Sequence, residues 1–189
     1  MCIFGRMINK IVEIGKVVEI KLRGGVVVGK NCRIHKGFKL SFEQNPKDKS
    51  VNGSVKIGND FFARDFLYID IVAPGKLTIG DGVFISNFCS ITSLESITIG
   101  NNTLLGENVR VYDHNHNFKE ISKIIKAQGF NTAPVIIGSN CWIASNVTIL
   151  KGVTIGDNSI IGAGCVVYKN VPSDSIMFSD GSIKHKENN

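Results

Sequence analysis

The sequence of 189 residues lacks several features that define other classes of protein. It has no apolar run of about eighteen residues, so a transmembrane helix is not expected. The N-terminal stretch MCIFGRMINK lacks the long apolar segment and the small-residue cleavage site of a secretory signal. The five cysteines include no closely spaced CxxC pair, which argues against a disulfide framework and against a zinc site. A reducing, cytoplasmic compartment is therefore expected.

Aromatic residues and concentrated charge are also scarce. The chain has one Trp and three Tyr, and it contains no aromatic motif for stacking nucleic-acid bases. Its 22 Lys and Arg against 16 Asp and Glu give a net charge of +6, but the basic residues are scattered along the sequence. This balance fits an anionic small molecule as well as it fits nucleic acid. We therefore expect no nucleic-acid partner.

What the sequence does contain is a repeat of six residues. An aliphatic residue recurs at every sixth position in the second half of the chain, at Ile137, Ile143, Ile149, Ile155, Ile161 and Val167. A small or β-branched residue follows four positions after each of the first five, at Cys141, Val147, Val153, Ser159 and Cys165. A period of six matches neither a helical stripe nor a long alternating strand. The pattern is a hexapeptide repeat.

The same period continues backwards, with interruptions, through four earlier triplets of apolar positions. These are Val28, Ile34 and Leu40; Ile57, Ala63 and Ile69; Ile79, Ile85 and Ile91; and Ile99, Leu105 and Val111. Each triplet opens near a turn such as VGKN, IGND or IGDG, in which Gly, Asn and Asp tolerate positive φ. Four cysteines follow an inward position by four residues, so we expect small core residues rather than nucleophiles at Cys32, Cys89, Cys141 and Cys165.

One interruption, from Tyr112 to Pro134, is long enough to be functional. It begins YDHNH. Imidazoles are suited to acid–base catalysis near neutral pH, so His114 could act as a general base toward a substrate hydroxyl, while Asp113 could fix its orientation. His116 suits a supporting role as well as a direct one. A polar turn is the alternative, and a metal site is a weak one, because two histidines at this spacing supply at most one pair of ligands.

The repeat resembles that of the hexapeptide-repeat proteins, whose fold is a left-handed parallel β-helix. The resemblance implies an all-β prism of about six triangular coils, with a column length of about 29 Å at about 4.8 Å per stacked layer. Residues 1–26 would form an N-terminal cap, residues 27–172 the β-helix domain, and residues 173–189 a C-terminal tail. The stretch at 112–134 would be the one long loop.

Within these proteins, GENVRVYDHNHNF and APVIIGSNCWIASNVTILKGVTIGDNSIIGAGCVVYKNVP resemble the acetyl-CoA-dependent O-acetyltransferases, over about residues 57–172. The resemblance implies that His114 is the general base, with Asp113, Asn115 or His116 orienting it or the acceptor. It also implies direct transfer without a metal, in a homotrimer whose sites lie in clefts between adjacent prisms. The DHNH variant favours the polysaccharide branch, with a surface-polysaccharide or nucleotide-linked sugar as the acceptor.

The resemblance further implies where acetyl-CoA would bind. Trp142 matches a tryptophan that lines the site, and Ser145 matches a residue whose backbone amide and hydroxyl face the thioester. Ala163 matches a contact of the pantetheine arm, and Lys169 matches a lysine near the phosphates of coenzyme A. Asn87, in the coil before that of His114, would help to hold the acceptor.

One departure opposes the resemblance. The family usually continues after this stretch into a GxPAK segment that covers the adenine end of the cofactor, whereas this chain reads SDSIMFSDGSIKHKENN. A non-catalytic β-helix scaffold is therefore the alternative from another class, and an antibiotic-modifying acetyltransferase is a further one. The γ-class carbonic anhydrases share the prism, but the third histidine of their metal site is missing here.

Overall fold

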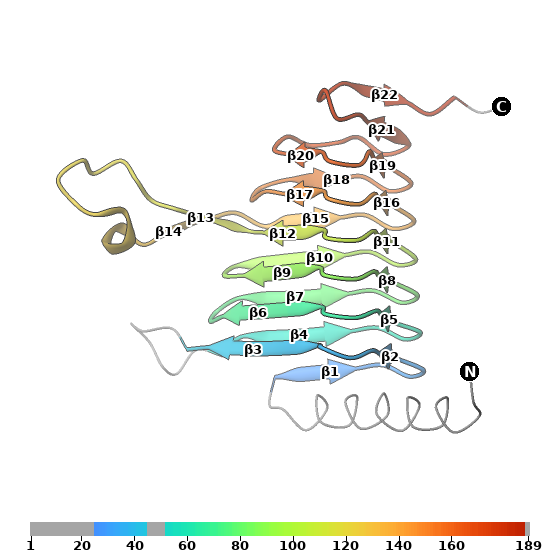
Figure 1. The fold of residues 1–189 in the computed structure, drawn as a ribbon, viewed down its shortest axis with the longest axis horizontal. Coiled ribbons are helices and arrows are strands. Elements are labelled where there is room, and N and C mark those ends of the chain that lie inside the picture. Colours follow the sequence, from blue (N-terminus) through green and yellow to red (C-terminus); the bar gives the residue numbers. More distant parts are fainter. Residues whose placement is uncertain (1–24, 45–51, 188–189) are drawn as a thin grey trace.

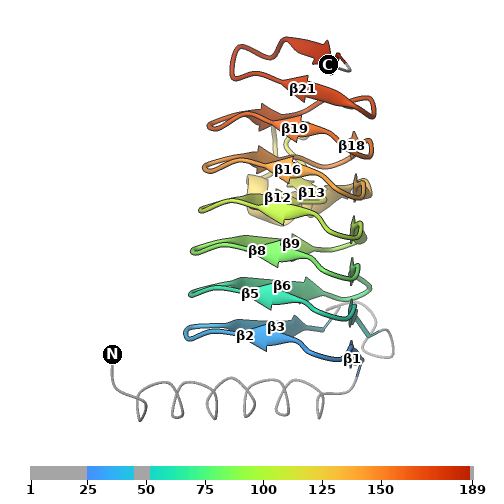
Figure 2. The ribbon, with the colours of Figure 1, turned by 90° about the vertical axis from the view of Figure 1, so that its right-hand side faces the viewer.

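The computed structural model describes residues 25–44 and 52–187, and these form a triangular column of stacked coils (Figures 1 and 2). Three parallel sheets make its three faces, and the chain visits them in the order A, B, C in each coil. Sheet A has strands β1 (Val26–Val28), β4 (Ser54–Ile57), β7 (Lys76–Ile79), β10 (Ser96–Ile99), β15 (Val135–Ile137) and β18 (Thr154–Ile155). Sheet C has strands β3 (Lys39–Glu43), β6 (Tyr68–Val72), β9 (Ser90–Ser93), β12 (Arg110–Tyr112), β17 (Thr148–Ile149) and β20 (Val166–Val167).

Sheet B is longer than the other two. Its parallel strands are β2 (Arg33–Ile34), β5 (Phe62–Ala63), β8 (Phe84–Ile85), β11 (Leu104–Leu105), β16 (Trp142–Ile143), β19 (Ile160–Ile161) and β21 (Ser175–Met177), and β22 (Ile183–His185) pairs antiparallel with β21. Sheets A and C have six strands each, so the six predicted coils of a left-handed β-helix are confirmed. Residues 173–189, set apart as a tail by sequence, thus contribute two further strands to this sheet.

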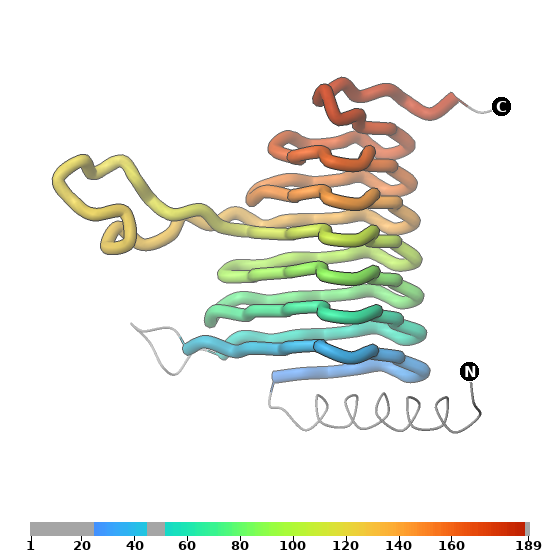
Figure 3. Tube along the Cα trace, in the orientation of Figure 1, coloured from blue at the N-terminus to red at the C-terminus, as the bar shows by residue number. Residues whose placement is uncertain are grey.

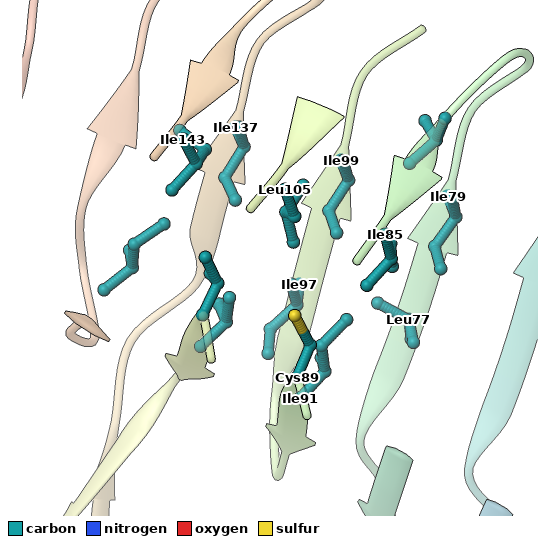
Figure 4. Close-up of a cluster of buried hydrophobic side chains, with 14 of the residues drawn as sticks. Leu77, Ile79, Ile85, Cys89, Ile91, Ile97, Ile99, Leu105, Ile137 and Ile143 are labelled. Atoms are coloured by element: carbon teal, nitrogen blue, oxygen red, sulfur yellow. The ribbon is translucent and has the colours of Figure 1, made fainter. Parts of the chain in front are cut away.

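The interior of the column is built from the positions that the repeat selects. All members of the predicted apolar triplets are buried, and side chains from successive coils meet in the same space (Figure 4). Because strands of adjacent coils are in register, Ile79 stands beside Ile99, and Ile99 beside Ile137. Each inward residue therefore packs on the equivalent residues of the coils before and after it. The six-residue period arises because successive inward residues, such as Ile137, Ile143 and Ile149, lie on the three successive faces of one coil.

The cysteines lie where the repeat predicts. Cys89, Cys141 and Cys165 are buried in the core, and Cys32 is partly buried against it. Burial raises the pKa of the Cys89 thiol to about 11 and also raises the pKa values of Cys141 and Cys165. A thiol that stays protonated at neutral pH is a poor nucleophile, so the three buried cysteines serve packing.

The turns from sheet A to sheet B explain the recurring Gly-Asn and Gly-Asp sequences. A side-chain oxygen in one turn accepts a backbone N–H from the turn of the coil before it, as Asp81 does for Asn59 at 2.6 Å and Asn101 does for Asp81 at 2.8 Å. Gly100 is required by close stacking, since a Cβ there would lie 2.6 Å from backbone atoms of Gly138 and Ser139. This edge is therefore held by a continuous ladder of polar contacts.

One long segment leaves the column. Between β12 and β15, strands β13 (His114–His116) and β14 (Phe130–Thr132) pair antiparallel, and a 3-10 helix, η1 (Ile125–Gln128), lies in the connection between them. This hairpin projects sideways from the edge between sheets C and A (Figures 1 and 3). The predicted loop at 112–134 is confirmed, and the antiparallel pairing at its base is a feature that the hexapeptide pattern does not contain.

Two predictions concern parts that the structure does not fully describe. The N-terminal cap at residues 1–26 lies outside the described residues except for its last two, and the last of these, Val26, already belongs to β1. No helix among the described residues has the length and apolarity needed to cross a membrane.

Candidate active site

The base of the hairpin holds a buried carboxylate beside an imidazole. Asp113 follows directly on β12 and is fully buried, and its Oδ1 lies 3.4 Å from Nδ1 of His114. The side chain of His114 is 16% exposed, so one part of the ring still reaches solvent. The structure therefore brings together the first two residues that the sequence proposes for acid–base chemistry.

Asp113 is held by the turn of the coil beneath it. Its Oδ1 accepts the N–H of Leu94 at 2.8 Å, and its Oδ2 accepts the Ser93 hydroxyl and the Glu95 N–H, both at 2.8 Å. Burial opposes ionisation of this carboxyl, but the hydrogen bonds from His114 and from residues 93–95 outweigh burial and lower its pKa. Asp113 is therefore a fixed anion that favours the tautomer of His114 with its proton on Nδ1, which can donate a hydrogen bond to the carboxylate. In that tautomer the lone pair of Nε2 is available.

Aromatic rings fix the plane of His114. The Tyr112 ring meets it edge-on with centroids 6.0 Å apart, and Phe130 on the paired strand meets it edge-on at 5.4 Å. The ring of His116 lies 4.5 Å from that of Phe130, its partner across the hairpin, and His116 is exposed. The two histidines thus share one aromatic partner, but the ion pair with Asp113 is made by His114 alone among the described residues.

Sequence reasoning missed the residues that hold this pair. The SLES stretch that contains Ser93 reads as a slip in the repeat, whereas the structure shows that this slip forms the cradle of Asp113. Lys151, in the turn after β17, was also missed: its Nζ donates to Asn131 Oδ1 at 2.7 Å and so fastens the hairpin to the column. Broken periodicity directly beneath the DHNH motif is the sequence signal that could have indicated the cradle.

The predicted donor residues lie on a different edge. Ser145 follows β16 and Ala163 follows β19, so both stand where the chain turns from sheet B to sheet C, an edge we call the BC edge. The turns stack closely, since the Gly164 N–H donates to the Ser145 carbonyl at 3.0 Å. Gly106 lies beneath Ser145, where a Cβ would come within 2.8 Å of the Ser145 nitrogen. Ala163 is exposed on this edge.

The other predicted residues are divided between the faces. Trp142 lies on the outer face of sheet B and is 52% exposed. Lys169 follows β20 and is exposed at the edge from which the hairpin leaves, two strands further along sheet C than β12. Asn115 is exposed in β13. Within one chain, the strands of sheet C separate the His114 pair from the BC edge.

Asn87 stands on the BC edge but has other partners. Its side-chain nitrogen donates to Glu107 at 2.8 Å, and its oxygen accepts the Asp65 N–H at 3.2 Å. Both contacts join the turns of neighbouring coils. Asn87 makes the stack of turns continuous, and any contact with an acceptor would have to be made in addition to this structural role.

No group of three or more His, Cys, Asp and Glu side chains gathers as a metal site within residues 25–44 and 52–187. The chemistry that the described groups can perform is proton transfer at His114. Nε2 of His114 can accept a proton, and the Asp113 carboxylate stabilises the imidazolium that results.

Comparison with known proteins identifies the family. The sequence profile of the bacterial transferase hexapeptide family (six repeats) matches residues 134–169. The putative lipopolysaccharide biosynthesis O-acetyl transferase WbbJ of Escherichia coli (strain K12) is 31% identical over 133 residues, which cover 67% of this chain and 68% of that protein. The chain belongs to the hexapeptide-repeat O-acetyltransferases.

Two solved acyltransferase structures have a similar fold. The galactoside acetyltransferase in complex with coenzyme A superposes with a TM-score of 0.58 at 28% identity, over 93% of this O-acetyltransferase and 72% of that chain. AntD, an N-acyltransferase from Bacillus cereus in complex with dTDP and 3-hydroxybutyryl-CoA, superposes with a TM-score of 0.72 at 19% identity, over 92% and 88% of the two chains. At that identity AntD shows the fold alone. The prediction of an acetyl-CoA-dependent O-acetyltransferase is confirmed.

Proposed function

We propose that this O-acetyltransferase acetylates a hydroxyl of a saccharide, either of a surface polysaccharide or of a nucleotide-linked sugar. The names of two relatives support the polysaccharide class: the WbbJ protein and the putative colanic acid biosynthesis acetyltransferase WcaF. The nucleotide-linked class is the alternative that the DHNH motif leaves open. We place the protein in the cytoplasm, where acetyl-CoA is available as the donor.

The buried pair of Asp113 and His114 carries this proposal. Asp113 holds the proton of His114 on Nδ1, so that Nε2 accepts the proton of the acceptor hydroxyl as its oxygen attacks the thioester carbonyl. His114 then returns the proton to the departing thiolate, and no acyl-enzyme forms. His116, which is exposed and contacts Phe130, would orient the hairpin or the acceptor, and Asn115 would help to bind the acceptor.

The BC edge fits the donor. Acetyl-CoA supplies the activated acyl group as a thioester. The exposed Ala163 and the open space around Gly164, where a Cβ would meet no atom within 4 Å, leave a flat path for an extended pantetheine arm. Ser145 on the same edge would direct its backbone N–H and its hydroxyl at the developing oxyanion. Trp142 would line the site, and Lys169, which lies at the edge from which the hairpin leaves, would meet the phosphates from a neighbouring copy.

The division of these residues between two edges supports a homotrimer. One chain presents His114 at the edge between sheets C and A, and it presents Ser145 at the BC edge, with sheet C between them. A complete site therefore requires the hairpin of one copy to face the BC edge of a neighbouring copy. Closed rings of identical subunits provide such a contact at every interface.

Matched histidine variants test the proposal. His114→Ala should lower kcat by about 10²–10⁴-fold, the range that general bases contribute, whereas His116→Ala should lower it by about tenfold or less, as expected of a supporting group. Turnover is measured as release of the coenzyme A thiol with oligosaccharides and nucleotide sugars as acceptors. Calorimetric titration with acetyl-CoA is the control, and both variants should bind the donor as the wild type does. Equal losses in the two variants would remove the assignment of His114.

A further inference from the structure

The outward residues of sheet B form an apolar stripe, which we call the outer stripe. Because the strands of this sheet are in register, one outward side chain of each coil stands beside that of the next coil. From β5 to β21 these side chains belong to Phe62, Phe84, Leu104, Trp142, Ile160 and Ile176. Sheet A presents Lys or Thr at the equivalent position in four of its six strands. Figure 2 shows the strands of sheet B stacked along one face, and Figure 1 shows that the hairpin leaves from the other side of the column. An apolar strip on one face of a column indicates a binding surface.

Two arginines lie over the aromatic rings at the N-terminal end of the outer stripe. The Cζ atom of Arg33 lies 4.3 Å from the centre of the Phe62 ring. The Cζ atom of Arg64 lies 5.8 Å from the centre of the Phe84 ring, and the two rings meet edge-on with centroids 5.4 Å apart. Both arginines are exposed. The attraction of the rings positions the guanidiniums, and their N–H groups stay available for a further partner.

The charge at this end of the outer stripe is positive. In the part of the chain that the structure describes, neither Arg33 nor Arg64 makes an ion pair with Asp or Glu. Asp65, which follows Arg64 in the chain, lies instead 3.4 Å from Nδ1 of His35 and 3.6 Å from Nζ of Lys36. Guanidiniums bind phosphate through two parallel N–H donors. The charges at this end of the stripe therefore favour a phosphate ester as the partner.

The outer stripe also passes the proposed donor site. Trp142 belongs to the stripe, and Ser145 lies in the turn that follows β16. Arg64 follows β5 directly, at the start of the BC edge and three coils before Ser145. Three coils amount to about 14 Å at about 4.8 Å per stacked layer. Acetyl-CoA would occupy the later coils, at Ala163, so the earlier coils are left for the acceptor. The distance from Ser145 to Arg64 suits a sugar ring followed by a phosphate ester.

We propose that the outer stripe binds the acceptor as a sugar diphosphate. Arg64 and Arg33 hold the phosphates, and the sugar ring packs on Phe84 and Leu104 with its reacting hydroxyl near Ser145. Resting on the proposed function, this arrangement narrows the acceptor to a sugar that is activated by a diphosphate, whose other substituent is a nucleoside or a lipid. A finished neutral polysaccharide would leave both arginines without an anionic partner.

Calorimetric titration of the full chain tests this binding. UDP, dTDP and farnesyl diphosphate carry the same diphosphate on a nucleoside or on a lipid, and the wild type should bind at least one of them saturably. Arg64→Gln and Arg33→Gln should each weaken that binding about tenfold or more, because each removes charge-assisted hydrogen bonds to phosphate. Arg64→Lys keeps the charge but loses the planar fork, so a loss of about threefold is expected. The control is Lys56→Gln, which removes one positive charge from sheet A in the same coil and should bind as the wild type does.

The pattern of binding identifies what the diphosphate is attached to. Binding of UDP or dTDP alone indicates a nucleotide-linked sugar, binding of farnesyl diphosphate alone indicates a lipid-linked one, and binding of both kinds indicates recognition of the diphosphate itself. No binding of any of the three at millimolar concentration would overturn the proposal. Equal losses in Lys56→Gln and Arg64→Gln would also overturn it, because the net charge of +6 would then be the cause. The titration requires neither acetyl-CoA nor turnover. Diphosphate binding without acetyl transfer would contradict the proposed function, whereas acetylation of neutral oligosaccharides that depends on His114, without diphosphate binding, would contradict the sugar-diphosphate site alone.

Discussion

The column and the hairpin differ in how their side chains are buried and bonded. In the column, each inward residue repeats the environment of its neighbours in the coils above and below, and the apolar side chains are buried. In the hairpin, the strands are antiparallel, the connection is closed by amide side chains, and the isoleucines face outward. The column is stabilised by burial, whereas the hairpin is stabilised by a few polar contacts with the column and with itself.

The proposed acid–base pair lies where these two regions meet. Asp113 lies at the junction of the column and the hairpin and is bonded to both. Its carboxylate is fixed by the turn of one coil, and its backbone carbonyl accepts the Ala133 N–H of the returning hairpin at 2.9 Å. A rigid scaffold fixes the position of a functional side chain, and a projecting segment makes that side chain accessible to substrate. His114 has both, since it is the first residue beyond the column.

The largest expected contrast is in stability. Ile143→Ala removes a fully buried side chain in β16 and should lower the free energy of unfolding by about 2–5 kcal/mol. Ile124→Ala removes a side chain of the connection between β13 and β14 that is 75% exposed and should change the free energy of unfolding by less than about 0.5 kcal/mol. Urea denaturation followed by circular dichroism gives both values. A similar loss from both variants would mean that Ile124 is buried in the protein as it exists in solution.

Substitution of Asp113, at the junction of column and hairpin, should lower the free energy of unfolding by an intermediate amount that depends on pH. The pKa of Asp113 is lower in the folded protein than in the unfolded chain, so its contribution to stability is present at neutral pH and is lost as the pH falls through the unfolded and then the folded pKa. Asp113→Asn should lower the free energy of unfolding at pH 7 by about 1–3 kcal/mol, because it leaves at least one donor of residues 93–95 without its acceptor.

Denaturation curves measured between neutral and acidic pH distinguish this cause from simple misfit. The wild type should lose more stability than Asp113→Asn as the pH falls below about 4, so the two values should converge. A constant difference at all pH values would show that the ionised carboxylate is not what holds the junction.

The features of the column could be predicted from the sequence, whereas those of the hairpin and its junction largely could not. The inward positions, the six coils and the burial of Cys89, Cys141 and Cys165 were predicted because each depends on a local pattern that the stacking repeats. The cradle of Asp113 was not, because it joins residues 93–95 to a carboxylate eighteen to twenty positions later through an interruption of that pattern. The pairing of β13 with β14 and the continuation into β21 likewise lack a six-residue signature.

The smallest effect on stability is expected at the ion pair between Lys123 and Glu120. Nζ of Lys123 lies 2.6 Å from the Glu120 carboxylate, yet both side chains are 56% exposed, so water screens the pair and holding two long side chains costs entropy. Lys123→Gln should therefore change the free energy of unfolding by less than about 0.5 kcal/mol, as measured by urea denaturation. Loss of folding stability well above this value would make the ion pair a structural part of the hairpin.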